Sequence, residues 1–224
     1  LASHQVADPW LVDSEQLEKK PKEELESALS GFDASLVPGG FGSRGVEGKI
    51  KAIQFARETG KPFLGLCFGL QLAVVEAGRN LLGWKNANST EMDDATSHPL
   101  IYIMPEQKGV ADLGGTLRLG VKKTVVEKGS AAFKLYGEEE IHKRHRHRYE
   151  VNPKYVADLE KAGVVFSGKS EDGRRMEILE IPTHLFFMGT QYHPEFDSRL
   201  GRPEPLFYGF IKAAKASAEN KSKE

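Results

Sequence analysis

The sequence has little cysteine, no excess of charge and no long apolar run. Its 224 residues include one cysteine, Cys67, which excludes an internal disulfide, a CxxC redox pair and a cluster of thiolate zinc ligands within the chain. Lys and Arg number 31 against 32 Asp and Glu, so no global charge attracts nucleic acid or an acidic membrane. No apolar run approaches the roughly 18 residues of a membrane-spanning helix, and the first ten residues do not resemble a signal peptide. We therefore expect a cytoplasmic protein.

What is present is the composition of one globular domain. Hydrophobic residues make up 39% and charged residues 28% of the chain, values that exclude the disordered and fibrous classes. A length of 224 residues suffices for a sizeable core. We expect residues 1–224 to form a single domain that closes with a helix over 204–217, followed by a disordered tail over 219–224.

Segments between residues 22 and 79 alternate between helical and extended patterns. Helical spacing occurs over 22–31, 47–60 and 68–79, and apolar strands are expected over 34–40 and 62–66. This order is typical of strand–helix–strand units and predicts an α/β fold with a mostly parallel central sheet flanked by helices. Extended stretches separated by turns in the C-terminal half predict a smaller antiparallel portion.

Residues 163–170, GVVFSGKS, match the phosphate-loop motif G-x-x-x-x-G-K-[ST]. A phosphate loop is a flexible turn between a strand and a helix, because its backbone N–H groups curl around phosphate oxygens. Here Val164, Val165 and Phe166 favour a strand, and an Asp-Gly turn and a second strand follow. We interpret the segment as a β-hairpin with Lys169 near its tip and reject nucleotide binding at this motif.

A single cysteine is more often a small buried hydrophobe than a catalyst, but the context of Cys67 differs. It stands in G-L-C-F-G, flanked by Gly65 and Gly69, between a predicted strand and a predicted helix, which is the cysteine form of a nucleophile elbow. The helix dipole favours the thiolate, and the amide of Phe68 points toward a developing oxyanion. The glycine-rich segment 38–45 is a candidate for the second half of this oxyanion hole, with a plain glycine turn as the alternative.

A cysteine nucleophile needs a base, and the chain has seven histidines. His193 ends an apolar strand, where an open α/β sheet places its chemistry, and Glu195 lies two residues further on, close enough to orient the imidazole. The alternative is a surface histidine beside a proline. His98 also precedes a proline, but it has no carboxylate at the same spacing.

Six segments in order resemble one family: PGGFGSRGVEG, FLGLCFGLQLAVVE, NANSTE, DLGGTLRLG, RHRHRYEVN and QYHPEF. Together they resemble the glutaminase domain of the CTP synthase family, from about residue 32 to the closing helix. The cysteine elbow with His-Pro-Glu is shared by the wider class I glutamine amidotransferases. The segments NANSTE, DLGGTLRLG and RHRHRYEVN narrow the resemblance to the CTP synthase family. The chain starts without the opening strand and helix usual in such domains, so the resemblance implies truncation at the N-terminus.

The resemblance implies that L-glutamine is hydrolysed to glutamate and ammonia through a thioester on Cys67. His193 would be the general base that then protonates departing ammonia, and Glu195 the carboxylate that orients it. The implied substrate-binding residues are Gly40, Phe68, Gly69, Leu70, Gln71, Glu91 and Arg148. Glutamine is a zwitterion, and Glu91 and Arg148 supply one partner for each of its charges, although Glu91 alone would be interpreted as a solvated loop acid.

The resemblance also implies cofactors and partners. No cofactor or metal is expected in this domain. Ammonia would pass to a separate synthetase domain that converts UTP to CTP with ATP and Mg²⁺, in a homo-tetramer of the full-length protein. GTP would be an allosteric activator of glutamine hydrolysis, with Phe41 and Arg118 as candidate contacts.

The basic run HKRHRHRY, residues 142–149, admits a nucleic-acid interpretation and, alternatively, that of a basic strand. The resemblance places it beside the glutamine site, so we expect neither a nucleic acid nor a membrane as partner. Two other functions remain open. The first is that of a non-catalytic regulatory or assembly module of CTP synthase. The second is that of a different cysteine amidohydrolase, such as a γ-glutamyl hydrolase.

Overall fold

Two β-sheets organise the part of the chain that the computed structural model describes, residues 7–104 and 117–221. The larger sheet has seven strands, which in spatial order are β1 (Ser35–Val37), β2 (Phe63–Leu66), β10 (Phe187–Thr190), β9 (Met176–Glu180), β8 (Val165–Ser170), β5 (Arg118–Val126) and β6 (Glu140–His147). The smaller sheet contains β3 (Ala87–Ser89), β4 (His98–Ile103) and β7 (Tyr149–Val151).

The pairing of the larger sheet is mixed. β2 lies between β1 and β10 and is parallel to both, whereas every other pair, from β10 to β6, is antiparallel. The α/β class and the antiparallel C-terminal portion are therefore confirmed, but the antiparallel portion is larger than the sequence indicated. The parallel strands form the end of the sheet at which Cys67 and His193 lie.

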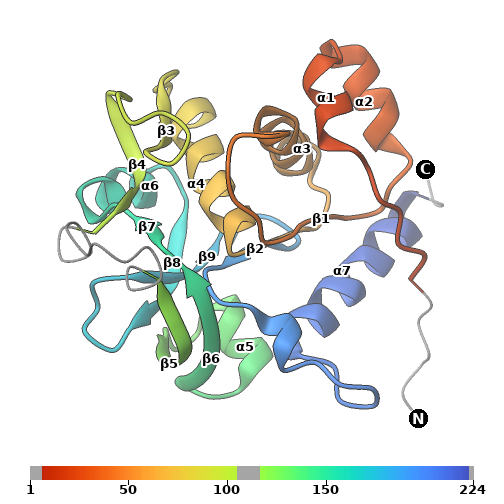
Figure 1. Cartoon of the computed structure of the whole chain (residues 1–224). Coiled ribbons are helices and arrows are strands. Elements are labelled where there is room, and N and C mark those ends of the chain that lie inside the picture. Colours follow the sequence, from red (N-terminus) through yellow and green to blue (C-terminus); the bar gives the residue numbers. More distant parts are fainter. Residues whose placement is uncertain (1–6, 105–116, 222–224) are drawn as a thin grey trace.

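Helices cover both faces of the larger sheet (Figure 1). The helices of the described ranges are α1 (Ser14–Lys19), α2 (Lys22–Ser30), α3 (Val46–Thr59), α4 (Phe68–Asn80), α5 (Ala131–Tyr136), α6 (Val156–Lys161) and α7 (Pro205–Lys221), with 3₁₀ turns η2 (Pro153–Tyr155) and η3 (Pro194–Phe196). α1 and α2 pack on α3. α3 and α4 lie on one face, and α5 and α7 lie on the other. Alternation along β2 explains why both faces are covered, because Phe63 belongs to the first core cluster and Leu64 to the second.

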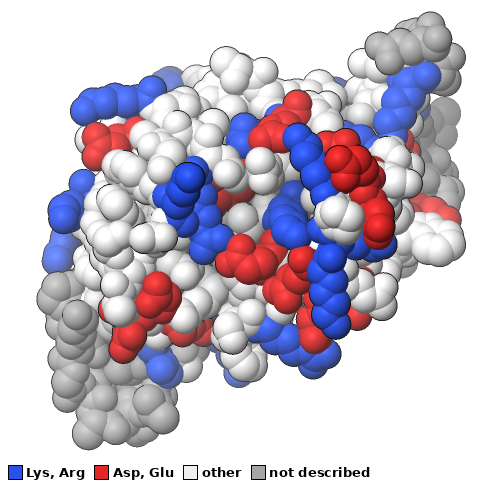
Figure 2. Space-filling model, turned by 90° about the horizontal axis from the view of Figure 1, so that it is seen from above, with Lys and Arg blue, Asp and Glu red and all other residues white. Residues whose placement is uncertain are grey.

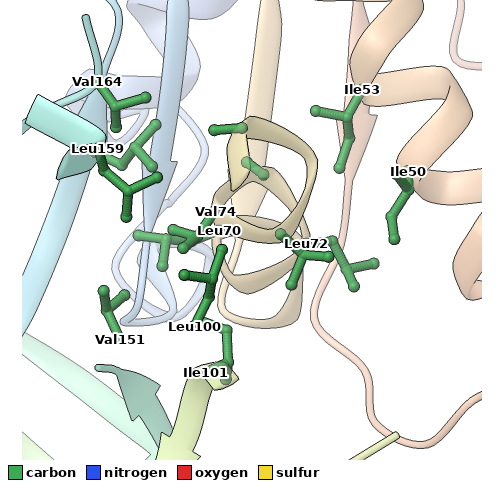
Figure 3. Close-up of a cluster of buried hydrophobic side chains, with 14 of the residues drawn as sticks. Ile50, Ile53, Leu70, Leu72, Val74, Leu100, Ile101, Val151, Leu159 and Val164 are labelled. Atoms are coloured by element: carbon green, nitrogen blue, oxygen red, sulfur yellow. The ribbon is translucent and has the colours of Figure 1, made fainter. Parts of the chain in front are cut away.

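Helix α4 runs through the centre of the main hydrophobic cluster. Figure 3 shows its side chains surrounded by those of α3 on one side and of α6 and the smaller sheet on the other. The labelled residues are all buried: Ile50, Ile53, Leu70, Leu72, Val74, Leu100, Ile101, Val151, Leu159 and Val164. This packing explains why most residues of α4 are apolar, as expected for a helix enclosed by its neighbours, with Gln71 and Glu76 as buried polar exceptions.

Several local predictions can be compared with the structure. Residues 165–170 form strand β8, which pairs antiparallel with β9, so the hairpin interpretation of the phosphate-loop match is confirmed. The disordered tail predicted over 219–224 is wrong for residues 219–221, because α7 continues to Lys221. Lys221 donates to the carbonyls of Ser30 and Phe32 and pairs with Asp33, which holds this end of the helix. Residues 222–224 lie outside the described residues, as do 112–116 of the DLGGTLRLG segment.

Charged side chains of both signs share the face of the molecule that Figure 2 draws. On the face drawn in Figure 2, the side chains of Lys and Arg are interleaved with those of Asp and Glu. Within residues 7–104 and 117–221, no helix combines the length and the apolar character needed to cross a bilayer.

The start of α4 lies unusually close to β1. A Cβ atom added to Gly69 would lie 2.2 Å from the carbonyl oxygen of Val37, closer than any side chain can approach. The backbone of α4 therefore packs directly on the end of β1, where the glycine-rich segment 38–45 begins. Only glycine at position 69 permits this approach.

We expect Gly69→Ala to lower the free energy of unfolding by about 3 kcal/mol, because the added methyl group forces β1 and α4 apart. Chemical denaturation measures the change. The matched control is Gly31→Ala, since Gly31 has a helical φ of −66° and nothing within 4 Å of the added atom. A loss at Gly69 no larger than the loss at Gly31 would show that the close approach is not required.

Candidate active site

Cys67 occupies a strained corner between β2 and α4. Its φ of 50° and ψ of −96° make it the one non-glycine residue with a positive φ in the described part of the chain. Its N–H donates to the carbonyl of Thr190 at 2.6 Å, which ties the corner to β10. A Cβ atom on Gly65 would lie 2.7 Å from the carbonyl carbon of Gly69, so the turn has no room for a side chain there. These features confirm the tight turn between a strand and a helix that the sequence predicts at Cys67.

His193 and Glu195 approach this corner from the carboxyl end of β10. His193 is the N-cap residue of η3, and its N–H donates to the carbonyl of Arg144 in β6 at 2.9 Å. Its Nδ1 lies 2.7 Å from Oε1 of Glu195. Because β10 and β2 are parallel neighbours with Thr190 opposite Leu66, both segments leave the sheet at the same edge.

Gly39 shows how close the cysteine and the histidine are. A Cβ atom on Gly39 would lie 3.0 Å from Cε1 of His193 and 3.8 Å from Cβ of Cys67. The sequence analysis did not single out Gly39, although it lies in the glycine-rich segment 38–45. The structure therefore brings Cys67, His193 and Glu195 together, with the backbone of Gly39 against both Cys67 and His193.

The electrostatics of His193 fit a partner that is negatively charged. Its Nε2 atom is buried and makes no hydrogen bond of normal geometry with the described residues. The sulfur of Cys67 is nevertheless the largest cause that raises the pKa of His193 to about 10, and Glu195 is the second. An imidazole with this pKa keeps its proton at neutral pH when it faces a thiolate, which is the state that a cysteine nucleophile requires.

The glycine-rich segment 38–45 lies beside the start of α4. A Cβ atom on Gly40 would be 3.3 Å from Cδ1 of Phe68, so the backbone of Gly40 lies against the aromatic ring of Phe68. The N–H of Gly42 donates to Oε1 of Glu91 at 2.9 Å. Glu91 thereby fixes the far side of the same segment.

Among the predicted substrate-binding residues, Glu91 and Arg148 lie near Tyr149, whereas the side chain of Leu70 lies in the core. Tyr149 links Glu91 and Arg148: burial raises the pKa of Tyr149, the negative charge of Glu91 raises it further, and the positive charge of Arg148 lowers it. Both predicted partners of the glutamine charges therefore lie near Tyr149. In contrast, the side chain of Leu70 is fully buried in the main core cluster, so a substrate can contact this residue only through its backbone.

Sequence analysis missed Gln191. This residue is fully buried, and its Nε2 lies 3.7 Å from the Sγ atom of Cys67. Its Oε1 accepts from Nε2 of Gln71 at 3.2 Å. The only signal was its position, two residues before His193 at the end of the predicted strand.

The basic run 142–149 contributes strand β6, as one alternative predicted. Lys143, His145 and His147 point inward and are buried, while the residues between them are exposed. Burial, followed by the charge of Arg118, lowers the pKa of His145 to about 2 and that of His147 to about 3. These two histidines are therefore neutral in the folded protein, and the positive charge of the run comes from its Lys and Arg side chains.

The two candidate contacts for GTP lie in different environments. Phe41 is 87% exposed at the tip of the glycine-rich segment. Arg118 turns inward instead and forms an ion pair with the buried Glu177.

Within the described ranges, no group of three or more His, Cys, Asp or Glu side chains is arranged to hold a metal ion.

We expect Glu195→Gln to lower the pKa of His193 from about 10 toward its ordinary value, because the carboxylate stabilises the imidazolium. The interaction with Cys67 remains, so the pKa should stay above 6.5. An NMR titration of the histidine ring protons measures the change. Asp197→Asn is the matched control, since this carboxylate lies two residues further on and pairs with Lys143. Equal titration of His193 in wild type and Glu195→Gln would contradict the assigned role.

Sequence comparison finds known proteins that are similar to this chain. The sequence profile of the family "Glutamine amidotransferase class-I" matches residues 11–213. The chain is 56% identical over 203 residues to the CTP synthase of Archaeoglobus fulgidus, and these aligned residues make up 91% of this chain and 37% of that protein. It is 55% identical over 214 residues to the CTP synthase of Methanosarcina acetivorans, covering 96% of this chain and 39% of that protein. The chain thus spans less than two fifths of the length of these relatives.

Solved structures agree with the sequence comparisons. The chain superposes with a TM-score of 0.88 on the glutaminase domain of Trypanosoma brucei CTPS with bound acivicin, at 40% identity, over 93% of this chain and 81% of the other. A Thermoplasma acidophilum protein, described as a putative component of GMP synthase, superposes with a TM-score of 0.58 at 19% identity, over 89% and 80% of the two chains. The second likeness shows a common fold.

Proposed function

Since this chain belongs to the class I glutamine amidotransferase family, we propose that it hydrolyses L-glutamine to glutamate and ammonia with Cys67 as the nucleophile. The observation that supports this most directly is the contact of a strained cysteine corner with a histidine that has a carboxylate partner. This arrangement provides a nucleophile, a proton carrier and an orienting group in the order that acyl transfer requires.

The reaction proceeds in two steps. In the first, the Cys67 thiolate attacks the γ-carboxamide carbon of glutamine, and the amides of Gly40 and Phe68 stabilise the oxyanion. His193 donates its proton to the departing amine, so ammonia leaves and a thioester remains. In the second step, His193 removes a proton from water, the hydroxide attacks the thioester, and glutamate leaves as the thiolate and the imidazolium are restored.

Recognition of glutamine depends on its two charges. Glu91 would pair with the ammonium group, and Arg148 would bind the α-carboxylate with its planar guanidinium. Glu91 also accepts from the N–H of Gly42, so it connects the substrate to the segment that contains Gly40. Gly69, Leu70 and Gln71 would complete the site, Leu70 through its backbone. Binding of the substrate therefore aligns the oxyanion hole.

The ammonia would be used by a second unit. The curated relatives are named CTP synthase and are more than twice as long as this chain, and the trypanosome structure is described as a glutaminase domain. We propose that a synthetase domain accepts the ammonia and converts UTP to CTP with ATP and Mg²⁺, in a homo-tetramer. GTP would activate hydrolysis through the exposed Phe41, whereas Arg118 is already paired with Glu177.

We expect the purified chain to release glutamate and ammonia from L-glutamine, with a stronger signal when GTP is present. Cys67→Ala and His193→Asn should each lower kcat at least about 10³-fold, since each removes a member of a cooperating set. His98→Asn is the matched control, because His98 also precedes a proline but lies in β4. Coupled glutamate and ammonia assays give the rates.

Two results would redirect the proposal. A folded chain that neither hydrolyses glutamine nor forms a covalent adduct at Cys67 with a glutamine-like electrophile would indicate a regulatory or assembly module. Faster release of glutamate from γ-glutamyl peptides than from glutamine would indicate a γ-glutamyl hydrolase. Full activity in Cys67→Ala would overturn the mechanism itself.

A further inference from the structure

A buried row of polar groups leads from Tyr149 to the reactive sulfur. Nε2 of Gln71 lies 3.0 Å from the backbone carbonyl oxygen of Tyr149 and 3.2 Å from Oε1 of Gln191. Nε2 of Gln191 in turn lies 3.7 Å from Sγ of Cys67. Gln71, Gln191 and Cys67 are all at most 5% exposed. Four groups from three separate segments therefore form one continuous hydrogen-bonded row, since Cys67 and Gln71 both belong to the start of α4.

The direction of this row is fixed by its first member. A backbone carbonyl oxygen can only accept hydrogen bonds, so the amide of Gln71 must turn its NH₂ group toward Tyr149. The same NH₂ group faces Gln191, which must therefore present its oxygen to Gln71. The NH₂ group of Gln191 is then left pointing at the sulfur. The carbonyl of Tyr149, two members further along the row, thus determines the orientation of the Gln191 amide next to Cys67.

The backbone of Gln191 is fixed as firmly as its side chain. Its N–H donates to the carbonyl of Glu177 in β9 at 2.9 Å. The residue directly follows β10, beside the corner at Cys67, because Thr190 is the register partner of Leu66. If the amide of Gln191 turned away from the sulfur, its hydrogen bonds to Gln71 and to Cys67 would both break.

We infer that Gln191 is a further catalytic residue, which donates an N–H to the Cys67 thiolate, and that Gln71 is a positioning residue that orients it. This inference rests on the proposed function of Cys67. A thiolate accepts hydrogen bonds more strongly than a thiol, so the donor favours the reactive form. Gln191 remains uncharged throughout and leaves the proton on His193 available for the departing ammonia.

The test is the pH dependence of alkylation at Cys67, the single cysteine of the chain. Iodoacetamide is applied between pH 5 and pH 9, and the mass of the chain reports modification. We expect Gln191→Met, which keeps the side-chain volume but removes the donor, to raise the pH midpoint of alkylation by about one unit. For glutamine hydrolysis, kcat should fall about tenfold while KM changes less than about twofold, because the bond acts on the sulfur.

Gln71→Met is the second variant, and it tests the orientation argument without touching the sulfur. We expect it to raise the same midpoint, since Gln191 loses the partner that holds its oxygen. The effects of the two substitutions should be less than additive, because both act through one amide. Gln54→Met is the matched control: this glutamine lies in α3, where its amide bonds to Glu58.

The outcomes separate this inference from the proposed function. If wild type shows neither alkylation at low pH nor glutamine hydrolysis, the proposed function fails. If wild type shows both, and a folded Gln191→Met has the midpoint of wild type, the inference alone is wrong. Should Gln191→Met fail to fold, the midpoint of Gln71→Met decides in its place, and a midpoint equal to that of Gln54→Met overturns the inference.

Discussion

The site depends on one tight backbone corner, in which β2 turns into α4 at Cys67. The corner holds a non-glycine residue at a positive φ, a conformation that costs free energy and persists only when its surroundings enforce it. Those surroundings are the close contact of Gly69 with Val37 and the bond from Cys67 to Thr190. Burial of α4 at the centre of the main core supplies the free energy that offsets this strain. The same packing that stabilises the fold therefore aims the sulfur out of the sheet.

Around this corner, parts of the chain that are far apart in sequence contribute one group each. β10 ends beside β2 and delivers Gln191 and His193, while β6 holds the backbone of His193 through the carbonyl of Arg144. The glycine-rich segment 38–45 brings Gly40 against Phe68. The backbones of these groups are held by hydrogen bonds or close packing, and side-chain hydrogen bonds, such as that between Gln71 and Gln191, complete the arrangement. Preorganisation of this kind is what makes electrostatic stabilisation of an oxyanion effective.

Much of this arrangement could be predicted from the sequence, since its signals are local. The elbow followed from small residues on both sides of Cys67, and the pairing of His193 with Glu195 followed from spacing and from the strand before them. Gln191 was missed because its role depends on partners at positions 71 and 149, and no local pattern shows such a row. The smaller sheet of β3, β4 and β7 was missed for the same reason, because its strands pair across long separations in the chain. The helical residues 219–221 were misjudged because their composition is polar, while their contacts with Ser30, Phe32 and Asp33 are tertiary.

The proposed reaction requires that Cys67 attacks a glutamine carbonyl whose oxygen is bound by the amides of Gly40 and Phe68. A crystal structure of the chain after reaction with a chloromethyl ketone analogue of glutamine tests it most directly. We expect one covalent bond, from the sulfur of Cys67, with the ketone oxygen between these two amides and the α-carboxylate at Arg148. A bond to another side chain, or an oxygen that faces away from both amides, would contradict it.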